Sequence, residues 1–191
     1  MSIYNRELDT LFIHNPKTAG TSMERIIGGG GHYPIWIYHR FVKGLDDVFK
    51  FGFVRHPLDR FVSAFFHQPN VVGVEHNQEG FNKFVEKIKD KSLNPKKDYP
   101  HLSGWTIHHH FLPQWFFLCD FKTKEVAVDF VGRFEHLERD WGKVCDTVGV
   151  DDRLAHLRTT DHKHYKEYYT PETEKMVRQL YKEDFEIFNY G

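Results

Sequence analysis

The segment Pro16–Ser22 brings together residue types that bind phosphate groups. Lys17 offers a full positive charge, and Thr21 and Ser22 offer hydroxyl donors. Gly20 lets the backbone turn sharply and approach a ligand closely. If a helix begins here, its first amide groups have no partners within the helix and attract an anion. The segment therefore predicts a phosphate-binding loop, and an ordinary solvated turn with a helix cap is the alternative interpretation.

A second group of polar residues, from Arg55 to Ser63, has the same layout with different charges. The planar guanidinium of Arg55 suits a pair of phosphate oxygens. Ser63 follows about two helical turns later, and it shares fourfold spacing with Asp59 and His67 on an expected polar face. These residues predict a second phosphate site. The alternative is that Arg55 pairs with Asp59 while Ser63 fills a tight contact between helix and sheet.

Both groups need a strand before them and a helix after them. Leu11–Ile13 and Phe49–Val54 are short apolar runs that are typical of buried strands. After the first run, a helix is expected to continue to about Ile27, because consecutive glycines follow it. Pro57 suits the first turn of a second helix. The apolar residues of that helix recur with helical spacing, and they are Leu58, Phe61, Val62, Phe65 and Phe66.

Farther along the chain, Trp115–Leu118 and Val126–Phe134 are predicted to be strands. Leu137–Val148 has the apolar spacing of a helix that ends at Gly149. A last helix is expected to begin at Thr170 and to continue to Phe188. Strands that alternate with helices predict an α/β fold with a parallel sheet and helices on both sides. Ligands of such sheets bind beyond the carboxyl ends of the strands, where both polar groups would lie.

The composition excludes several classes of protein. The chain has 191 residues, with 26 Lys and Arg against 27 Asp and Glu, and this balance is unlike that of a protein that coats nucleic acid. No apolar run approaches the roughly 20 residues that span a membrane, and the polar N-terminus is unlike a signal peptide. The two cysteines are too few for a disulfide framework. We therefore expect a single cytoplasmic domain over residues 1–191, without nucleic-acid or membrane partners.

The two polar groups, in their order along the chain, resemble the phosphate loops of sulfotransferases that use 3′-phosphoadenosine 5′-phosphosulfate (PAPS). Phe12–Ser22 resembles the family's loop for the 5′-phosphosulfate, and Phe53–Ser63 resembles its loop for the 3′-phosphate. The similarity is closest to the carbohydrate-type, Golgi-like branch and its bacterial relatives. It continues in His110–Gln114, Gly132–Glu138 and Tyr169–Phe188. His56 departs from the family pattern, which often has Asp or Asn before the proline. The resemblance implies a three-layer α/β/α sandwich related to the P-loop NTPases.

The resemblance also implies a reaction, in which a sulfuryl group moves from PAPS to a hydroxyl group of a carbohydrate or small metabolite. Lys17 would stabilise the departing phosphate of adenosine 3′,5′-bisphosphate, and no metal would be required. His32 would accept the proton of the hydroxyl, with His39 as the second candidate. The residues expected to bind PAPS are Lys17, Thr18, Ala19, Gly20, Thr21, Ser22, Arg55 and Ser63.

Two other functions stay open from the residues alone. A nucleotide kinase could use the same fold, although Lys17 precedes the only glycine of its loop, whereas a Walker A lysine follows two glycines. A non-catalytic nucleotide-binding protein could keep both loops. A zinc site at His108–His110 is not favoured, because adjacent strand residues face opposite sides and no acid or cysteine has ligand spacing. The sequence does not determine the oligomeric state.

Overall fold

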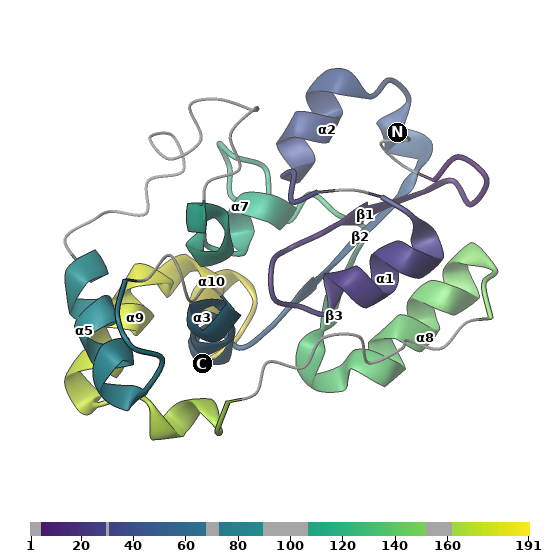
Figure 1. Ribbon diagram of the computed structural model, residues 1–191. Coiled ribbons are helices and arrows are strands. Elements are labelled where there is room, and N and C mark those ends of the chain that lie inside the picture. Colours follow the sequence, from purple (N-terminus) through teal and green to yellow (C-terminus); the bar gives the residue numbers. More distant parts are fainter. Residues whose placement is uncertain (1–4, 30, 68–72, 90–106, 152–161) are drawn as a thin grey trace. The chain divides into compact units, whose positions relative to one another are not determined.

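The computed structural model describes residues 5–29, 31–67, 73–89, 107–151 and 162–191 (Figure 1). The chain divides into two compact units, each built from two stretches of sequence. The first unit comprises Met1–Arg55 with Gln114–Thr159, and the second comprises His56–Pro113 with Thr160–Gly191. Each unit has its own buried apolar cluster. The expectation of one domain over the whole chain stays a prediction.

The first unit contains a parallel sheet. Its strands are, in spatial order, β1 (Thr10–Ile13), β2 (Phe49–Val54) and β3 (Phe130–Arg133). The register between β1 and β2 places Phe12 opposite Phe51. All of β1 is buried, which is usual where a parallel sheet is covered on both faces. The first two strands match the predicted runs, and the predicted α/β fold class is confirmed.

Helices cover both faces of this sheet (Figure 1). On one face, α1 (Gly20–Ile27) and α8 (Leu137–Val148) pack against aromatic side chains of the first two strands. The buried residues shared there are Phe12, Met23, Ile27, Phe51, Phe53, Trp141, Val144 and Cys145. On the other face, Gly52 lies so close to α7 (Trp115–Leu118) that a Cβ at this position would come within 2.3 Å of Leu118 Cδ2. This is the layered arrangement that the resemblance implied.

The prediction of a strand at Trp115–Leu118 is wrong, because these residues form the short helix α7. The amide groups of its third and fourth residues donate to the carbonyl of Gln114 at 3.0 and 3.3 Å. All four side chains are buried, so the run has no period that distinguishes a helix from a strand. Of the predicted strand Val126–Phe134, only Phe130–Arg133 form β3, and Val126 forms an isolated antiparallel bridge with Cys119.

Short helical elements complete the first unit. They are α2 (Ile35–Phe41) and the 3₁₀ helices η1 (Leu45–Asp47) and η3 (Phe134–His136). Helix α2 contacts α7. Helix α8 follows its prediction and ends at Gly149, whose φ of 72° lies in the left-handed region that glycine enters without strain.

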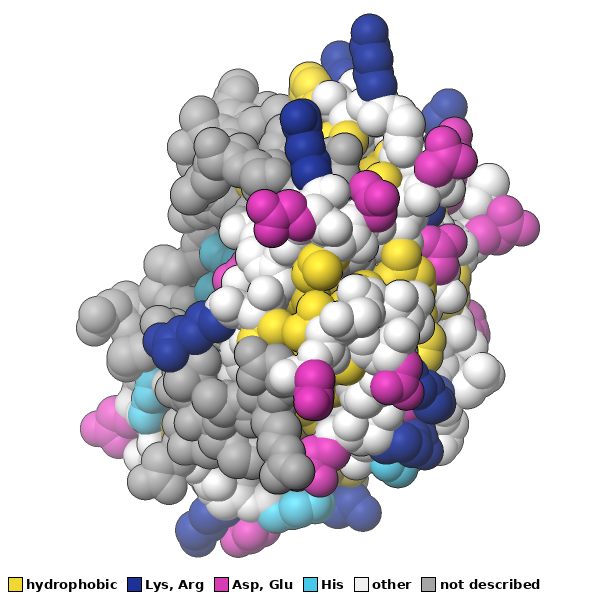
Figure 2. All heavy atoms as spheres, turned by 90° about the vertical axis from the view of Figure 1, so that its right-hand side faces the viewer, with side chains coloured by type: hydrophobic (Ala, Val, Ile, Leu, Met, Phe, Trp, Pro, Cys, Tyr) yellow, Lys and Arg dark blue, Asp and Glu magenta, His cyan; other side chains and the backbone are white. Residues whose placement is uncertain are grey.

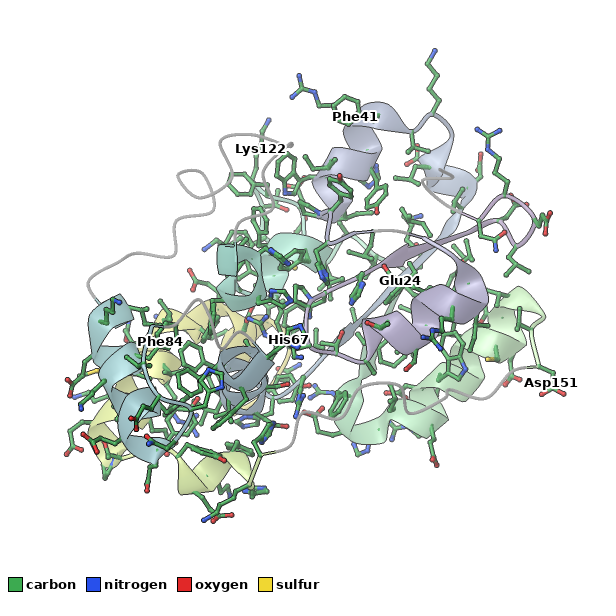
Figure 3. The ribbon with its side chains drawn as sticks, viewed as in Figure 1. Glu24, Phe41, His67, Phe84, Lys122 and Asp151 are labelled. Atoms are coloured by element: carbon green, nitrogen blue, oxygen red, sulfur yellow. The ribbon has the colours of Figure 1, made fainter. Side chains whose placement is uncertain are left out.

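The described residues of the second unit form helices around an aromatic core. They are α3 (Pro57–His67), α5 (Gln78–Lys89), η2 (Ile107–Phe111), η4 (Tyr165–Glu167), α9 (Pro171–Leu180) and α10 (Lys182–Ile187). Helix α3 matches its prediction, and its apolar stripe packs with Phe81 and Phe84 of α5, of which Phe84 is labelled in Figure 3. Arg60 of α3 is fully buried and donates to the carbonyls of His110 and Leu112 at 3.1 and 2.5 Å.

The single terminal helix expected from Thr170 is divided into α9 and α10. Thr170 caps α9 as predicted, and its hydroxyl accepts a hydrogen bond from the amide of Thr173. The helix is interrupted at Tyr181, whose φ of −109° and ψ of 26° are not helical. The fully buried hydroxyl group of Tyr181 donates to the carbonyl of Phe111 at 2.6 Å. This long-range contact gave no signal in the periodicity of the segment.

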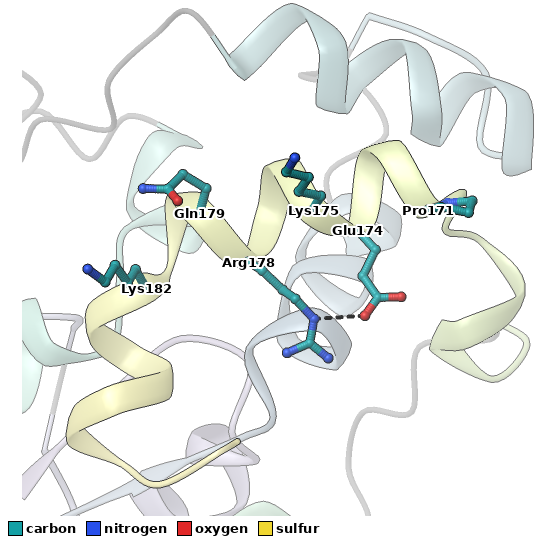
Figure 4. A pocket seen from close by; sticks show the side chains of 6 residues that line it. All are labelled: Pro171, Glu174, Lys175, Arg178, Gln179 and Lys182. Atoms are coloured by element: carbon teal, nitrogen blue, oxygen red, sulfur yellow. Dashed lines mark hydrogen bonds and ion pairs between the residues drawn. The ribbon is translucent and has the colours of Figure 1, made fainter.

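The surface carries charges of both signs. Basic and acidic side chains are interspersed on the face shown in Figure 2. An open hollow of about 540 Å³ along α9 is lined by Pro171, Glu174, Lys175, Arg178, Gln179 and Lys182 (Figure 4). Two of its cations already have acidic partners, because Arg178 pairs with Glu174 at 2.8 Å and Lys182 pairs with Glu186 at 3.6 Å. Within the described ranges, no helix is both long and apolar enough for a membrane span.

Candidate active site

The predicted phosphate-binding loop joins β1 to α1 in a constrained conformation. Lys17 and Ala19 have φ values of 69° and 66°, in the left-handed region that costs a residue with a side chain roughly 1 kcal/mol. Between them, the buried hydroxyl of Thr18 donates to the carbonyl of Asn15 at 2.7 Å. Two strained residues held by a buried hydrogen bond indicate a loop whose shape is imposed by its surroundings.

Helix α1 begins without a side-chain cap. Ala19 at the N-cap makes no side-chain hydrogen bond, and the first turn contains no acidic residue. The amide of Ser22 donates to the carbonyl of Ala19 at 3.0 Å, whereas those of Gly20 and Thr21 have no partner among the described residues. Unpaired amide donors at the positive end of a helix form an anion site. The structure therefore leaves this end of α1 able to bind a phosphate group.

Arg55 lies beside this loop within the same unit. Its Nη1 atom is 3.4 Å from the carbonyl oxygen of Lys17, and its guanidinium carbon is 4.2 Å from the ring centroid of Phe134. The aromatic face supports the planar guanidinium and restricts its rotation. The segments after β1 and β2 thus meet where Arg55 contacts the backbone of Lys17, and the phosphate-binding roles of both residues stay predictions.

A buried amide network joins the two strand ends. Gln114 is fully buried, and its Nε2 donates to the carbonyl of Arg55 while its Oε1 accepts from the amide of Arg55, both at 2.9 Å. Asn15, also fully buried, donates from Nδ2 to the same Oε1 at 3.0 Å and to the carbonyl of Phe53 at 2.9 Å. Each amide orientation is determined by its partners. Gln114 therefore holds Asn15 and Arg55 in one register.

His32, the predicted general base, lies against His14. Its Nδ1 is 2.9 Å from the carbonyl oxygen of His14, and the two ring centroids are 4.1 Å apart. A carbonyl oxygen only accepts hydrogen bonds, so Nδ1 of His32 carries a proton. The neutral ring then has its lone pair on Nε2. Because His14 directly follows β1 and precedes the phosphate-binding loop, this contact places His32 next to that loop.

His14 follows β1, and its buried ring lies against Gly20, the first residue of α1. Its Nδ1 is 2.8 Å from Oε1 of Glu24, which is labelled on α1 in Figure 3. Its Nε2 and Cδ2 lie only 2.1 Å from the point where a Cβ on Gly20 would be. Gly20 is therefore needed for the close approach of this ring, whereas the left-handed turn that the sequence assigned to Gly20 falls on Lys17 and Ala19. No local pattern in the sequence indicated the pairing of His14 with Glu24.

The model of one protein family matches most of this chain. The matched residues are 37–191, and the matched description is "Sulfotransferase family". The chain belongs to the sulfotransferase family. The match includes Arg55, Ser63 and Gln114, and it begins after the loop Pro16–Ser22. Membership supports sulfuryl transfer in general. No curated protein and no solved structure matched the chain.

Two further residues that the sequence assigned to the site of this sulfotransferase, His39 and Ser63, lie on helices α2 and α3. His39 is exposed on α2. Ser63 is 2% exposed on α3 of the second unit, whereas Asp59 and His67, with which it shares fourfold spacing, are half-buried. The role of Ser63 beside Arg55 stays a prediction. His108, considered above as a zinc ligand, has a side chain outside the described part of the chain.

Asp140 of α8 fixes the carboxyl end of β3 in the same unit as the loop. It is 3% exposed, and its Oδ2 accepts from the amide of Arg133 at 3.0 Å. Burial acts to raise the pKa of Asp140, but hydrogen bonds from Arg139, the Arg133 amide and Lys143 outweigh it and lower the pKa to about 2. Asp140 is therefore ionised at neutral pH and holds β3 against α8.

Proposed function

We propose that this sulfotransferase moves a sulfuryl group from PAPS to a hydroxyl group of a carbohydrate or small-molecule acceptor. The observation that carries the proposal is the uncapped start of α1 beside Lys17 and Arg55. Two free amide donors and two cationic side chains suit a nucleotide with two separate phosphate groups. The near-zero net charge favours a small acceptor over nucleic acid.

In this proposal, Lys17 and Arg55 bind different phosphate groups of the nucleotide. PAPS supplies an activated sulfuryl group, whose bond to the 5′-phosphate breaks as the bond to the acceptor oxygen forms. Lys17 and the amides of Gly20 and Thr21 stabilise the negative charge that develops on the departing phosphate. Arg55 binds the 3′-phosphate, which fixes the nucleotide and distinguishes it from ATP. The role expected for Ser63 from the sequence stays a prediction. A single departing phosphate carries less charge than a triphosphate, so the proposal includes no metal ion.

His32 acts as the general base in this proposal. The acceptor hydroxyl must lose a proton while its oxygen attacks, and a neutral imidazole nitrogen takes that proton near pH 7. Nε2 is the basic nitrogen of His32, because its Nδ1 proton is engaged by the carbonyl of His14 at 2.9 Å. This contact favours His32 over the exposed His39 of α2.

Calorimetric titration tests the donor. We expect adenosine 3′,5′-bisphosphate to bind without magnesium and to bind more tightly than ADP or ATP. Arg55→Ala should weaken the bisphosphate more than ADP, because ADP lacks the 3′-phosphate. The exposed Arg25 on α1 provides a matched control, and Arg25→Ala should leave all three affinities unchanged. Binding of ATP that needs magnesium, with no heat from the bisphosphate, would support a kinase and contradict the proposal.

A transfer assay tests the reaction and the acceptor class. With PAPS labelled in its sulfuryl group, we expect the label to appear on hydroxyl compounds from a panel of monosaccharides, oligosaccharides and small alcohols. Lys17→Ala should abolish this transfer. Bisphosphate binding without transfer to any member of the panel would support the non-catalytic alternative.

A further inference from the structure

We propose that Glu24 and His14 are positioning residues that set the orientation and tautomer of His32. The inference rests on the proposed function, in which His32 is the base, and it adds two residues to which no role has been assigned. Neither is proposed to touch a substrate. Their function follows from a chain of contacts that runs from α1, through the residue after β1, to His32.

The first step is the contact between Glu24 and His14. Oε1 of Glu24 lies 2.8 Å from Nδ1 of His14, and the two side chains are 24% and 9% exposed. A carboxylate only accepts, so Nδ1 of His14 carries the proton and the ring cannot exchange its tautomer without losing this bond. A charge-assisted bond in a largely buried position is stronger than a neutral one. Glu24 therefore fixes one tautomer of His14.

The second step is the packing that restricts the His14 ring. Phe12 stacks on it with ring centroids 5.6 Å apart and an interplanar angle of 23°. The Cδ2 and Nε2 atoms of the His14 ring occupy the space where a Cβ on Gly20 would lie. An aromatic neighbour, a glycine and a carboxylate thus leave the ring a single orientation.

The third step transfers this orientation to His32. The ring of His14 packs on the ring of His32 at a centroid distance of 4.1 Å and an angle of 59°. The carbonyl of the same residue accepts the Nδ1 proton of His32 at 2.9 Å. One residue therefore supplies both a surface for the His32 ring and the acceptor that selects its tautomer. Fixed partners of this kind keep a catalytic imidazole in its productive form.

The test is Glu24→Gln, which keeps the shape of the side chain and removes its charge. The control is Arg25→Gln, because Arg25 is the next residue of α1 and is exposed. We expect Glu24→Gln to lower kcat about tenfold, without changing the affinity for adenosine 3′,5′-bisphosphate. We expect the ¹⁵N spectrum of the His32 ring to change from one tautomer to a mixture, and Arg25→Gln to change neither quantity.

A double-mutant cycle tests whether the effect passes through His14. His14→Phe keeps a planar ring without the Nδ1 proton, so adding Glu24→Gln to it should produce no further loss of kcat. Additive losses, an unchanged His32 spectrum in Glu24→Gln, or equal losses of kcat and bisphosphate affinity would each overturn the inference. If the wild-type protein transfers no sulfuryl group but Glu24→Gln still alters the His32 tautomer, the proposed function fails while the positioning pair stands.

Discussion

Gln114 exchanges two hydrogen bonds with the backbone of Arg55, one through each atom of its side-chain amide group, and both are 2.9 Å long. This is the pairing that a neighbouring strand would make, supplied by one side chain at the point where β2 ends. The same amide oxygen accepts from Asn15, so the loop that follows β1 and the arginine that follows β2 share one support. The geometry of the proposed nucleotide site therefore depends on Gln114.

We predict that Gln114→Leu destabilises the protein by about 3 kcal/mol, because the amide and carbonyl of Arg55 and the Asn15 amide would lose their buried partner. The affinity for adenosine 3′,5′-bisphosphate should fall as well. Urea unfolding and calorimetry measure the two effects. Gln179→Leu is the control, since Gln179 is exposed on α9 and its replacement should cost less than about 0.5 kcal/mol. An equal loss of unfolding free energy in the two variants would contradict the prediction that Gln114 stabilises the two strand ends.

We predict that Gly20→Ala destabilises the protein by about 2 kcal/mol, because its Cβ would lie 2.1 Å from atoms of the His14 ring. The displaced ring should also weaken nucleotide binding. Gly142→Ala is the matched control in α8, where a Cβ would meet no atom within 4 Å. There, alanine should stabilise the helix by about 0.5 kcal/mol, and thermal unfolding would give opposite shifts for the two variants.

We predict that Asp140 makes stability depend on pH in the acid range. Its pKa of about 2 in the folded protein is below that of an unfolded aspartate, so the stabilisation is complete above about pH 4. It should be lost as the pH falls from about 4 to about 2, and it amounts to about 2 kcal/mol. Asp140→Asn should remove this dependence in urea unfolding across pH. The control is Asp146→Asn, which changes an exposed residue of the same helix and should leave the stabilisation by Asp140 in place.

We predict that His32→Ala lowers kcat about 100-fold while the affinity for the bisphosphate is retained, because a general base contributes to the transition state and not to nucleotide binding. Steady-state kinetics and calorimetry separate the two quantities. His39→Ala should keep the wild-type kcat. The reverse result, a loss in His39→Ala alone, would move the base to α2.

The strands and helices beside the site could be predicted because each has clear local signals. Phe49–Val54 is an apolar run that ends at a polar turn, and its predicted bounds are those of β2. Helix α1 ends at Ile27 because consecutive glycines follow. Trp115–Leu118 lacks such a signal, since four buried residues fit a helix and a strand equally well. Tyr181 interrupts the last helix in favour of a contact with Phe111, seventy residues away.

The geometry of the candidate site could be predicted only in part, for a similar reason. The carboxyl ends of neighbouring parallel strands lie at one edge of a sheet, so the segments that hold Lys17 and Arg55 were expected to lie close together, and Arg55 does contact the Lys17 carbonyl. The roles of both residues stay predictions. The bond between His14 and Glu24 joins residues ten positions apart, and no helical or strand period connects them. Ser63 has helical spacing with Asp59, but packing buries it, and spacing alone does not measure burial.

The loop with Lys17 and Ala19 in left-handed conformations is already ordered without a bound nucleotide, so its conformational entropy is lost before binding. A flexible loop would become ordered as the nucleotide arrives, and that loss of entropy would weaken binding. Here the loop becomes ordered when the protein folds, so the lost entropy lowers the stability of the protein without nucleotide. If the protein binds a nucleotide as proposed, the loop need not change its conformation in each round of binding and release.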